Sequence, residues 1–396
     1  MSKKLIKFIL LGGILILSNG YFVKSFATNE LLLASWNLQN MMSQQHFVVW
    51  KKYCSAHNWK PTNKRPPILM YCDAHNGYDF FTKQKAYLTL HSWDKFKLKI
   101  NALKEKSHQI NADIYAIQEI TDLNALKLIL DEDDYHLMAT NYHISQNIAF
   151  AIRKKANLNP KFKLITELAI QNPKNKNQHL TRPGLEVTIS PAKTTIKILN
   201  IHLKAGCKNY IIDGDKLAGR FTDRIARNCQ ILRKQIIGLR KWISDQNRQK
   251  IPFLIMGDFN RLFSWELREH YRHKKPARLA GSDNLDAKSP ITDKTRLAYM
   301  FFALNESDRF VDRLMISFAD RKVGKYLKRG RCLYGNNYFI NSIRLANKLV
   351  LADGSDKTSG LVKIRSYERD YGDKHYGPTK ALPSDHCLLY GRITFE

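Results

Sequence analysis

Eight short apolar runs recur along this chain, and each of them is bordered by polar residues. The runs are Leu31–Trp36, Ile114–Ile117, Ile148–Ile152, Leu185–Ile189, Ile196–Ile201, Ile251–Met256, Phe310–Ser317 and Cys387–Phe395. Each spans four to nine residues and is rich in Ile, Leu and Val, which is typical of buried strands. Pro191-Ala192-Lys193 separates two of the runs and predicts a hairpin turn.

Two other segments carry apolar residues at helical spacing. The first covers 92–110 and the second covers 225–243. Their apolar positions are Trp93, Phe96, Ile100 and Leu103, then Ile225, Cys229, Leu232, Ile236, Leu239 and Ile243. Spacings of three and four place such residues on one helix face. Strands mixed with helices over 396 residues predict a layered α/β protein with a substantial core.

The N-terminus has the features of an export signal. Lys3, Lys4 and Lys7 precede an apolar stretch, and Ser25-Phe26-Ala27 offers a small-x-small cleavage site. We therefore expect residues 1–27 to be a signal peptide, with an uncleaved anchor as the alternative, and 28–396 to be the exported domain. This predicts a secreted or periplasmic protein with no stable membrane anchor after cleavage.

Export makes the cysteines interpretable as disulfides. The chain has six, with no Cys-x-x-Cys pair, and an even number in an exported protein favours disulfides over free thiols or a structural zinc site. The pairs closest in sequence, Cys54–Cys72 and Cys207–Cys229, are the preferred ones among the 15 possible pairings.

The chain is strongly basic. It has 65 Lys and Arg against 35 Asp and Glu, a formal net charge of +30, and loss of residues 1–27 lowers this only to +26. Such an excess favours an anionic partner such as nucleic acid, anionic lipid or a phosphorylated substrate, although it also fits a solvated basic surface.

Carboxylates, amides and imidazoles border six of the predicted strands. These residues are Asn37, Gln118-Glu119, His202, Asp258 with Asn260, Asp312, and Ser384-Asp385-His386. Such groups are costly to bury unless they are paired or bind a metal. Strands of one core place their ends together, so these side chains are expected to converge at one rim.

This ordered set resembles the endonuclease/exonuclease/phosphatase superfamily, typified by deoxyribonuclease I. The most specific pieces are Gly257-Asp258-Phe259-Asn260 and Ser384-Asp385-His386, supported by Ile117-Gln118-Glu119. The stretch 202–207 is similar to one found in exported bacterial members. The resemblance implies a four-layered α/β sandwich of two mixed sheets flanked by helices, forming one catalytic domain over 28–396 with basic loop insertions.

The activity that the resemblance implies is metal-dependent hydrolysis of a phosphate ester. Glu119 would be the principal ligand of Mg²⁺, or of Mn²⁺ or Ca²⁺, with Asn37 and Asp385 supplying further hard oxygen atoms. His386 would be the general base and Asp312 its partner. The remaining predicted roles are assigned to Asp258 and Asn260, which would orient water and a phosphate oxygen, to His202, which would donate to a phosphate or leaving-group oxygen, and to Arg182, a phosphate clamp.

One position departs from the family pattern. In deoxyribonuclease I the second histidine is paired with a glutamate just before a strand, whereas this sequence offers Gln146 or Asn147 there. An amide does not stabilise an imidazolium as a carboxylate does. His202 is therefore expected to act as a neutral hydrogen-bond donor.

The charge favours a polyanion among the substrates that this fold serves. We expect a monomer that hydrolyses DNA or RNA. Basic stretches with aromatic residues lie at Lys51–Lys60 with Trp50, Tyr53 and Trp59, at His270–Arg278 with Tyr271, and at Arg321–Arg331 with Tyr326. They fall in 40–91, 261–300 and 318–382, which lack clear strand patterns and are expected to be loops suited to phosphate contacts and base stacking.

Three alternatives stay open. An inositol-phosphate phosphatase would usually have Trp-Cys where Phe310-Val311 stands. A sphingomyelinase would need an exposed aromatic hairpin, for which Tyr334–Ile340 is a candidate. A basic nucleic-acid-binding protein without activity is disfavoured, because every expected catalytic residue except the one at the Gln146 position is present.

Overall fold

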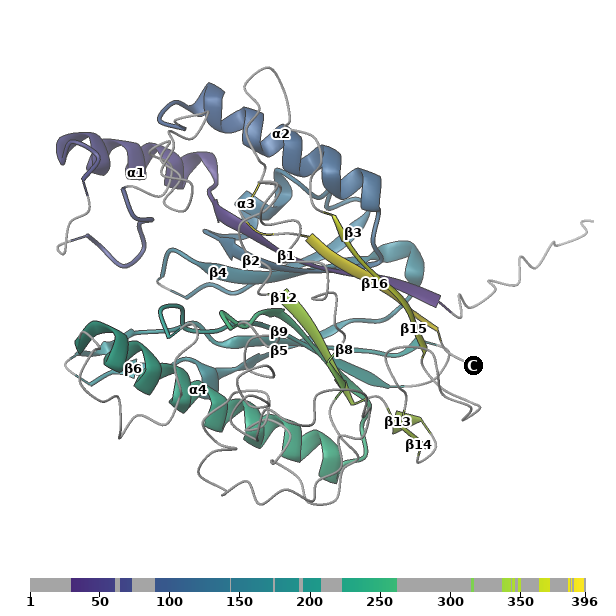
Figure 1. Cartoon of the computed structure of the whole chain (residues 1–396). Coiled ribbons are helices and arrows are strands. Elements are labelled where there is room, and N and C mark those ends of the chain that lie inside the picture. Colours follow the sequence, from purple (N-terminus) through teal and green to yellow (C-terminus); the bar gives the residue numbers. More distant parts are fainter. Residues whose placement is uncertain are drawn as a thin grey trace, which may run out of the picture.

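Two six-stranded sheets lie face to face, and helices cover their outer faces (Figure 1). The computed structural model describes residues 30–60, 65–72, 90–142, 144–173, 175–191, 195–207 and 223–261, and toward the C-terminus 315–316, 337–342, 344–345, 348–349, 363–370, 384, 386 and 388–394. The predicted four-layered α/β sandwich is confirmed.

The first sheet is mixed, with strand order β15-β16-β1-β2-β4-β3. The strands are β15 (Lys363–Asp370), β16 (Leu388–Thr394), β1 (Glu30–Met41), β2 (Ile114–Ile120), β4 (Asn147–Arg153) and β3 (Tyr135–Ala139). Strands β1 and β2 are parallel, and the other neighbours are antiparallel. Helices α1 (Gln44–Ala56), α2 (Trp93–Ile110) and α3 (Leu123–Lys127) cover its outer face.

The second sheet is also mixed, with strand order β11-β12-β10-β9-β8-β5. The strands are β11 (Met315–Ile316), β12 (Asn337–Ser342), β10 (Phe253–Asp258), β9 (Ile196–His202), β8 (Gly184–Ile189) and β5 (Lys161–Ile165). Only β9 and β10 are parallel. Helix α4 (Asp223–Arg248) covers its outer face.

Short elements complete the described part of the chain. The hairpins β6 (Gln171–Asn172) with β7 (Asn175–His179) and β13 (Arg344–Leu345) with β14 (Lys348–Leu349) stand apart from the two large sheets. Single 3-10 turns are η1 (Lys154–Ala156) and η2 (Thr166–Leu168).

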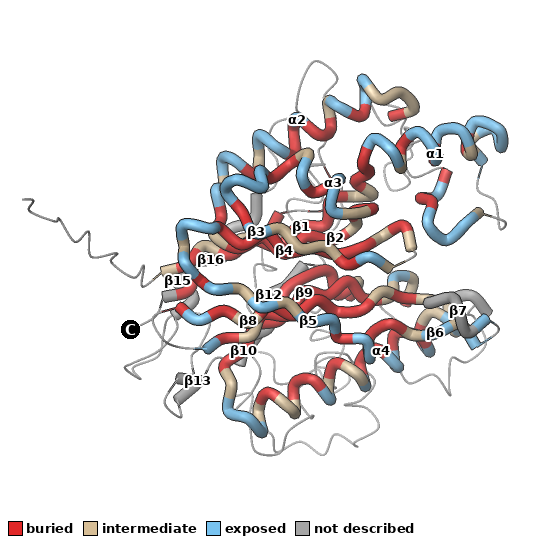
Figure 2. The backbone as a smooth tube through the Cα atoms, turned by 180° about the vertical axis from the view of Figure 1, so that it is seen from behind, coloured by how far each residue is buried: buried red, intermediate tan, exposed pale blue. Residues whose placement is uncertain are grey.

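Alternation along the strands builds three apolar layers. In β9, Ile196 and Ile198 point between the sheets, whereas Leu199 and Ile201 pack against α4. Strand β2 divides in the same way: Ile114 and Ala116 face the other sheet, whereas Tyr115 and Ile117 face the helices. Figure 2 shows the buried residues concentrated in the strands and on the helix faces turned toward them. The strands predicted as continuous apolar runs are therefore those with a packed layer on both faces.

Both preferred disulfides are confirmed. Cys54–Cys72 ties α1 to the segment 65–72, and Cys207–Cys229 ties the chain after β9 to α4. Cys332 and Cys387 lie outside the described residues. No helix in the described part of the chain is both long and apolar enough to span a membrane.

The prediction that 40–91 and 318–382 consist of loops is wrong in part. Helix α1 lies in the first segment, with Ser43 capping it by accepting from the backbone N–H of His46. The second segment contributes β12 to β15. Strands β3 and β5 were also not expected, because they lie at sheet edges and carry polar residues in place of a continuous apolar run.

Two of the three aromatic residues proposed for base stacking at 50–59 instead pack against other parts of the protein. Trp50 is fully buried in the layer beneath α1, and Trp59 stacks on His91 with 3.5 Å between ring centroids. The stretches at 270–278 and 321–331 lie outside the described residues. Of the candidate lipid hairpin 334–340, residues 337–340 belong to β12, which pairs with β10, and 334–336 lie outside the described residues.

Candidate active site at one end of the inter-sheet core

The rows of side chains that face between the sheets change from apolar to polar at one end. In β10, Leu254 and Met256 are followed on the same face by Asp258. The other central strands behave alike: the inward rows end in Ser35 and Asn37 on β1, Gln118 on β2, and Asn200 and His202 on β9, all buried. Since β1 is parallel to β2 and β9 to β10, these ends meet at the same edge.

Asp258 is the central group of this cluster. Its Oδ2 accepts a hydrogen bond from Asn37 Nδ2 at 3.0 Å and lies 3.7 Å from His202 Nε2 and 3.8 Å from His386 Nε2. Its Oδ1 accepts from the backbone N–H of Asn260 at 2.8 Å. With 1% of its surface exposed, this carboxylate is held by fixed donors rather than by water.

The glycine before Asp258 is required by the backbone. Gly257 has φ +134°, and a Cβ there would lie 2.0 Å from the carbonyl oxygen of Ile201 on the neighbouring strand. No side chain fits at that distance, so the Gly-Asp order allows Asp258 to reach the end of β10 beside His202.

Glu119 lies at an irregularity of β2. The pairing of β2 with both neighbours shifts around it, and its φ is +61°, in the left-handed region that costs a residue with a Cβ about 1–2 kcal/mol. The carboxylate accepts from Asn37 Nδ2 at 3.1 Å and from the backbone N–H of Asn40 at 3.0 Å. Asn40 has φ +58°, so two unusual backbone positions face each other at the site.

His202 is placed against a cation. Its Nδ1 contacts the guanidinium of Arg182, and its Nε2 lies 3.6 Å from Glu119 Oε1. Burial, and then the positive charge of Arg182, hold the pKa of His202 well below its usual range. A guanidinium only donates, so Nδ1 is the acceptor and the proton of the neutral ring lies on Nε2, facing the two carboxylates.

Arg182 itself is in a poorly solvated position. Burial lowers its pKa to about 10, while Glu119, Asp258 and Tyr71 act in the opposite direction. The guanidinium therefore remains charged at neutral pH. Within the described residues its Nε is buried and has no hydrogen-bond partner.

The segment that carries His386 is fastened to β1. Ser384 donates to the carbonyl of Asn37 at 2.6 Å and accepts from the backbone N–H of His386 at 3.1 Å. The carbonyl of His386 accepts from Trp36 Nε1 at 3.2 Å. Asp385, the predicted metal ligand, and Asp312, the predicted partner of His386, lie outside the described residues.

The two amide residues Gln146 and Asn147, at the start of β4, bind residues other than His202. Gln146 donates to the side chain of Asn40 at 3.0 Å, and Asn147 is buried in bonds to Thr140, Tyr142 and the carbonyl of Thr121. Arg182, and not a carboxylate, contacts His202 Nδ1, and together with burial it lowers the pKa of His202.

A divalent metal fits the chemistry of the central donors. Glu119 and Asp258 place two carboxylates around Asn37, whose Oδ1 accepts from the backbone N–H of Gln39 at 2.9 Å and keeps a second lone pair. Hard oxygen donors of this type suit Mg²⁺, Mn²⁺ or Ca²⁺. The described residues contain no cluster of three or more His, Cys, Asp or Glu side chains placed to hold a metal, and Asp385 is not among them.

One buried pair was missed in the sequence. Gln118 Nε2 donates to Asn200 Oδ1 at 2.8 Å across the two sheets, and Asn200 Nδ2 donates to the carbonyls of Ile117 at 3.0 Å and Ala149 at 2.8 Å. The signal was present, because Asn200 continues the inward Ile196, Ile198 row of β9. This amide pair closes the apolar core directly below Glu119 and His202.

No protein-family model and no curated protein matches the chain. Similar solved structures include the AP endonuclease LMAP from Leishmania major (11% identity, TM-score 0.44, 93% of this chain and 88% of that chain). Others are the endonuclease/exonuclease/phosphatase from Bacteroides vulgatus (10%, 0.42, 93% and 99%) and the human Nocturnin catalytic domain (12%, 0.42, 93% and 96%). The Bacteroides vulgatus protein carries the name of the superfamily that the motifs resemble.

Proposed function

We propose that this chain is an exported, divalent-metal-dependent phosphodiesterase that hydrolyses nucleic acid, DNA or RNA. The observation that carries the proposal is the meeting of Asp258 with His202, His386 and Asn37 at the end of the inter-sheet core, with Glu119 and Arg182 beside them. Export is supported by the N-terminal signal features and by the two disulfides.

The two histidines take different roles in this proposal. His386 accepts a proton from the attacking water, with Asp258 and Asn260 orienting that water and a phosphate oxygen. His202 donates a hydrogen bond from its Nε2–H to a phosphate or leaving-group oxygen, which its neutral state allows. Glu119, Asn37 and Asp385 would hold a divalent metal, which would supply positive charge to the phosphate.

Arg182 is assigned to the phosphate. A permanently charged, planar donor matches two phosphate oxygens, and its buried Nε offers a hydrogen-bond donor that no described group satisfies. Burying such a donor is costly unless a ligand accepts from it. These two features support assigning Arg182 to the group that is cleaved.

Nucleic acid is preferred over the other phosphate esters for two reasons. The net charge of +30 favours a polyanion, and residues 337–340 of the candidate lipid-entry hairpin 334–340 pair with β10 within a sheet. The inositol-phosphate alternative keeps only the shared fold in its favour.

The test is hydrolysis by the purified protein with Mg²⁺ of plasmid DNA, RNA, sphingomyelin and inositol phosphates. Nucleic acid should be cleaved, and EDTA should abolish cleavage. Asp258→Ala and His386→Ala should each lower turnover by about 10²–10⁴-fold, the range for a lost electrostatic group or general base. His136→Ala, an exposed position on β3, is the matched control and should retain full turnover.

Two results would contradict the proposal. Full activity in EDTA, or in both variants, would exclude the mechanism. Release of phosphocholine without cleavage of DNA or RNA would keep the chemistry and replace the substrate.

A further inference from the structure

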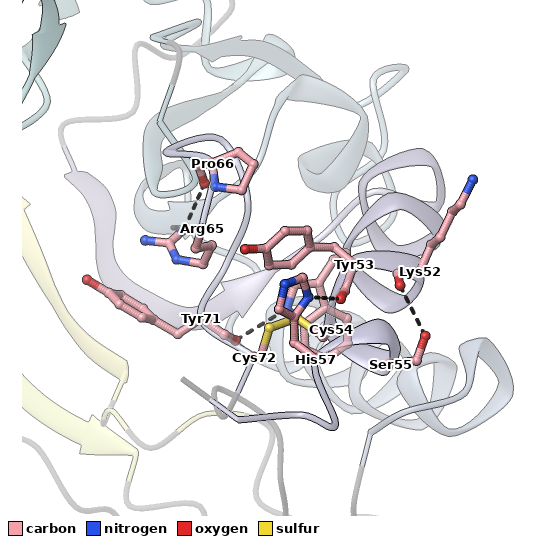
Figure 3. The surroundings of a disulfide bond; sticks show 10 residues. Lys52, Tyr53, Cys54, Ser55, His57, Arg65, Pro66, Tyr71 and Cys72 are labelled. Carbon is pink, nitrogen blue, oxygen red and sulfur yellow. Dashed lines mark hydrogen bonds between the residues drawn. A yellow bond between two sulfur atoms is a disulfide. The ribbon is translucent and has the colours of Figure 1, made fainter. Parts of the chain in front are cut away.

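Tyr71 is an exposed aromatic residue between two buried neighbours. Its neighbours Met70 and Cys72 are each 1% exposed, whereas Tyr71 is 55% exposed. Its carbonyl accepts from Trp50 Nε1 at 3.2 Å, and the next residue is fixed to α1 by the Cys54–Cys72 disulfide. Figure 3 shows the Tyr71 side chain pointing away from α1. The ring is thus held in solvent by a backbone that is anchored on both sides.

One face of this ring is covered by a cation. The guanidinium carbon of Arg65 lies 4.2 Å from the ring centroid of Tyr71, and both side chains extend to the same side of the segment (Figure 3). Arg65 Nη1 donates to the carbonyl of Pro66 at 3.2 Å, which orients the guanidinium and leaves further donors. An exposed tyrosine with an arginine on it combines a stacking surface with a phosphate-binding charge.

This pair is connected to the candidate active site by a short chain of hydrogen bonds. The backbone N–H of Ser145 donates to the carbonyl of Pro67 at 3.0 Å, and the next residue, Gln146, binds the side chain of Asn40. The backbone N–H of Asn40 binds Glu119. The segment 65–72 therefore lies on the rim next to the metal-ligand candidate.

We propose that Arg65 and Tyr71 form a nucleotide subsite beside the cleavage centre, in which Tyr71 stacks on an unpaired base and Arg65 binds a neighbouring phosphate. We call this pair the Arg65–Tyr71 platform. It rests on the proposed function, because it takes the strand that the active site cleaves. Of the aromatic residues that the sequence singled out, Trp50 is buried and the ring of Trp59 stacks on His91, so neither presents a free ring face as Tyr71 does.

The experiment measures binding rather than cleavage. Fluorescence anisotropy, in EDTA so that the strand stays intact, compares a labelled single-stranded oligodeoxynucleotide with an abasic phosphodiester oligomer of the same length. Tyr71→Ala should weaken binding of the oligodeoxynucleotide about five-fold or more, the effect of losing one stacked base. Its effect on the abasic oligomer should be small, since that ligand has no base to stack.

Two further variants separate the ring from its surroundings. Tyr71→Phe keeps the stacking face and should bind like the unchanged protein. Ile68 lies in the same segment and is 41% exposed. Ile68→Ala therefore serves as the matched control and should leave binding of both oligomers unchanged. Arg65→Gln should weaken binding of both oligomers alike, because it removes a phosphate contact.

The outcomes distinguish the platform from the proposed function. If the oligodeoxynucleotide binds and Tyr71→Ala has no effect, or weakens both oligomers equally, the platform is wrong and the nuclease proposal stands. If the unchanged protein binds neither oligomer but hydrolyses a small synthetic phosphodiester, the platform and the nucleic-acid substrate both fail while the phosphodiesterase chemistry stands.

Discussion

Replacing Asn200 with leucine should destabilise the protein by about 3–5 kcal/mol. The side chain is fully buried and makes three hydrogen bonds of 2.8–3.0 Å, to Gln118, Ile117 and Ala149. Each such bond contributes about 0.5–1.5 kcal/mol, and a partner left unsatisfied costs about 1–3 kcal/mol. Leucine has a similar branched shape but cannot donate, so the carbonyls of Ile117 and Ala149 lose a donor. The loss is a large part of the roughly 5–15 kcal/mol by which a typical domain is stable.

Urea unfolding in EDTA measures this loss, with the unfolding free energy obtained by linear extrapolation. Gln109→Leu is the control, because it also replaces a hydrogen-bonded amide but on the exposed side of α2, and it should change stability by less than about 0.5 kcal/mol. The double variant Gln118→Leu/Asn200→Leu should lose about 1 kcal/mol less unfolding free energy than the sum of the losses in the two single variants, since the two amides bind each other. A loss within 1 kcal/mol of the control for Asn200→Leu would refute the inter-sheet amide pair.

Three other perturbations have expected outcomes of their own. Reducing Cys54–Cys72, or replacing both cysteines with serine, should lower the unfolding free energy by about 3 kcal/mol, because the bond closes a loop of 18 residues; equal urea midpoints with and without the bond would contradict this. The pKa of His202 is lowered in the folded protein, so on acidification the unfolded chain binds a proton at this position before the folded chain does. The unfolding free energy should therefore be at its full value above about pH 6.5 and fall by up to about 1.4 kcal/mol per pH unit below it. His202→Gln should flatten that dependence in EDTA, and an unchanged slope would argue against a neutral His202. Gly257→Ala should prevent folding to the native state, seen as loss of soluble protein or of a cooperative urea transition, because of the clash with the Ile201 carbonyl; a variant as stable as the parent would refute the close approach.

The sequence was sufficient for those strands that are packed on both faces and for the long helices that bury one face against a sheet. Strands β1, β2, β4, β8, β9 and β10 and helices α2 and α4 were predicted within a few residues of their bounds, because burial imposes an apolar pattern that is visible in the chain itself. The convergence of Asn37, Glu119, His202 and Asp258 was predictable for the same reason: each follows such a strand, and parallel strands bring their ends together.

What the sequence did not predict depends on pairing and backbone geometry. Strand β5 is half exposed, so its pattern of Lys and Phe carries no clear period. The conformation of Glu119 depends on register shifts with both neighbouring strands, and neither shift is written in a local pattern. Tyr71 is a similar case, because its exposure between the buried Met70 and Cys72 is a property of the folded chain that no local pattern predicts.

The different environments of the two histidines explain why only one can serve as a base in the proposed mechanism. Both Nε2 atoms lie within 4 Å of the same oxygen of Asp258, so that carboxylate alone does not separate their roles. Arg182 does, because its guanidinium takes the Nδ1 acceptor of His202 and opposes a second positive charge there.

A ring that stays neutral and keeps its Nε2 proton donates a hydrogen bond but does not take up a proton from water. Proton uptake is thereby assigned to His386, which is held on β1 through Ser384 and Trp36. The amide at the Gln146 position is compatible with catalysis for the same reason, since a histidine that remains neutral does not need a carboxylate partner.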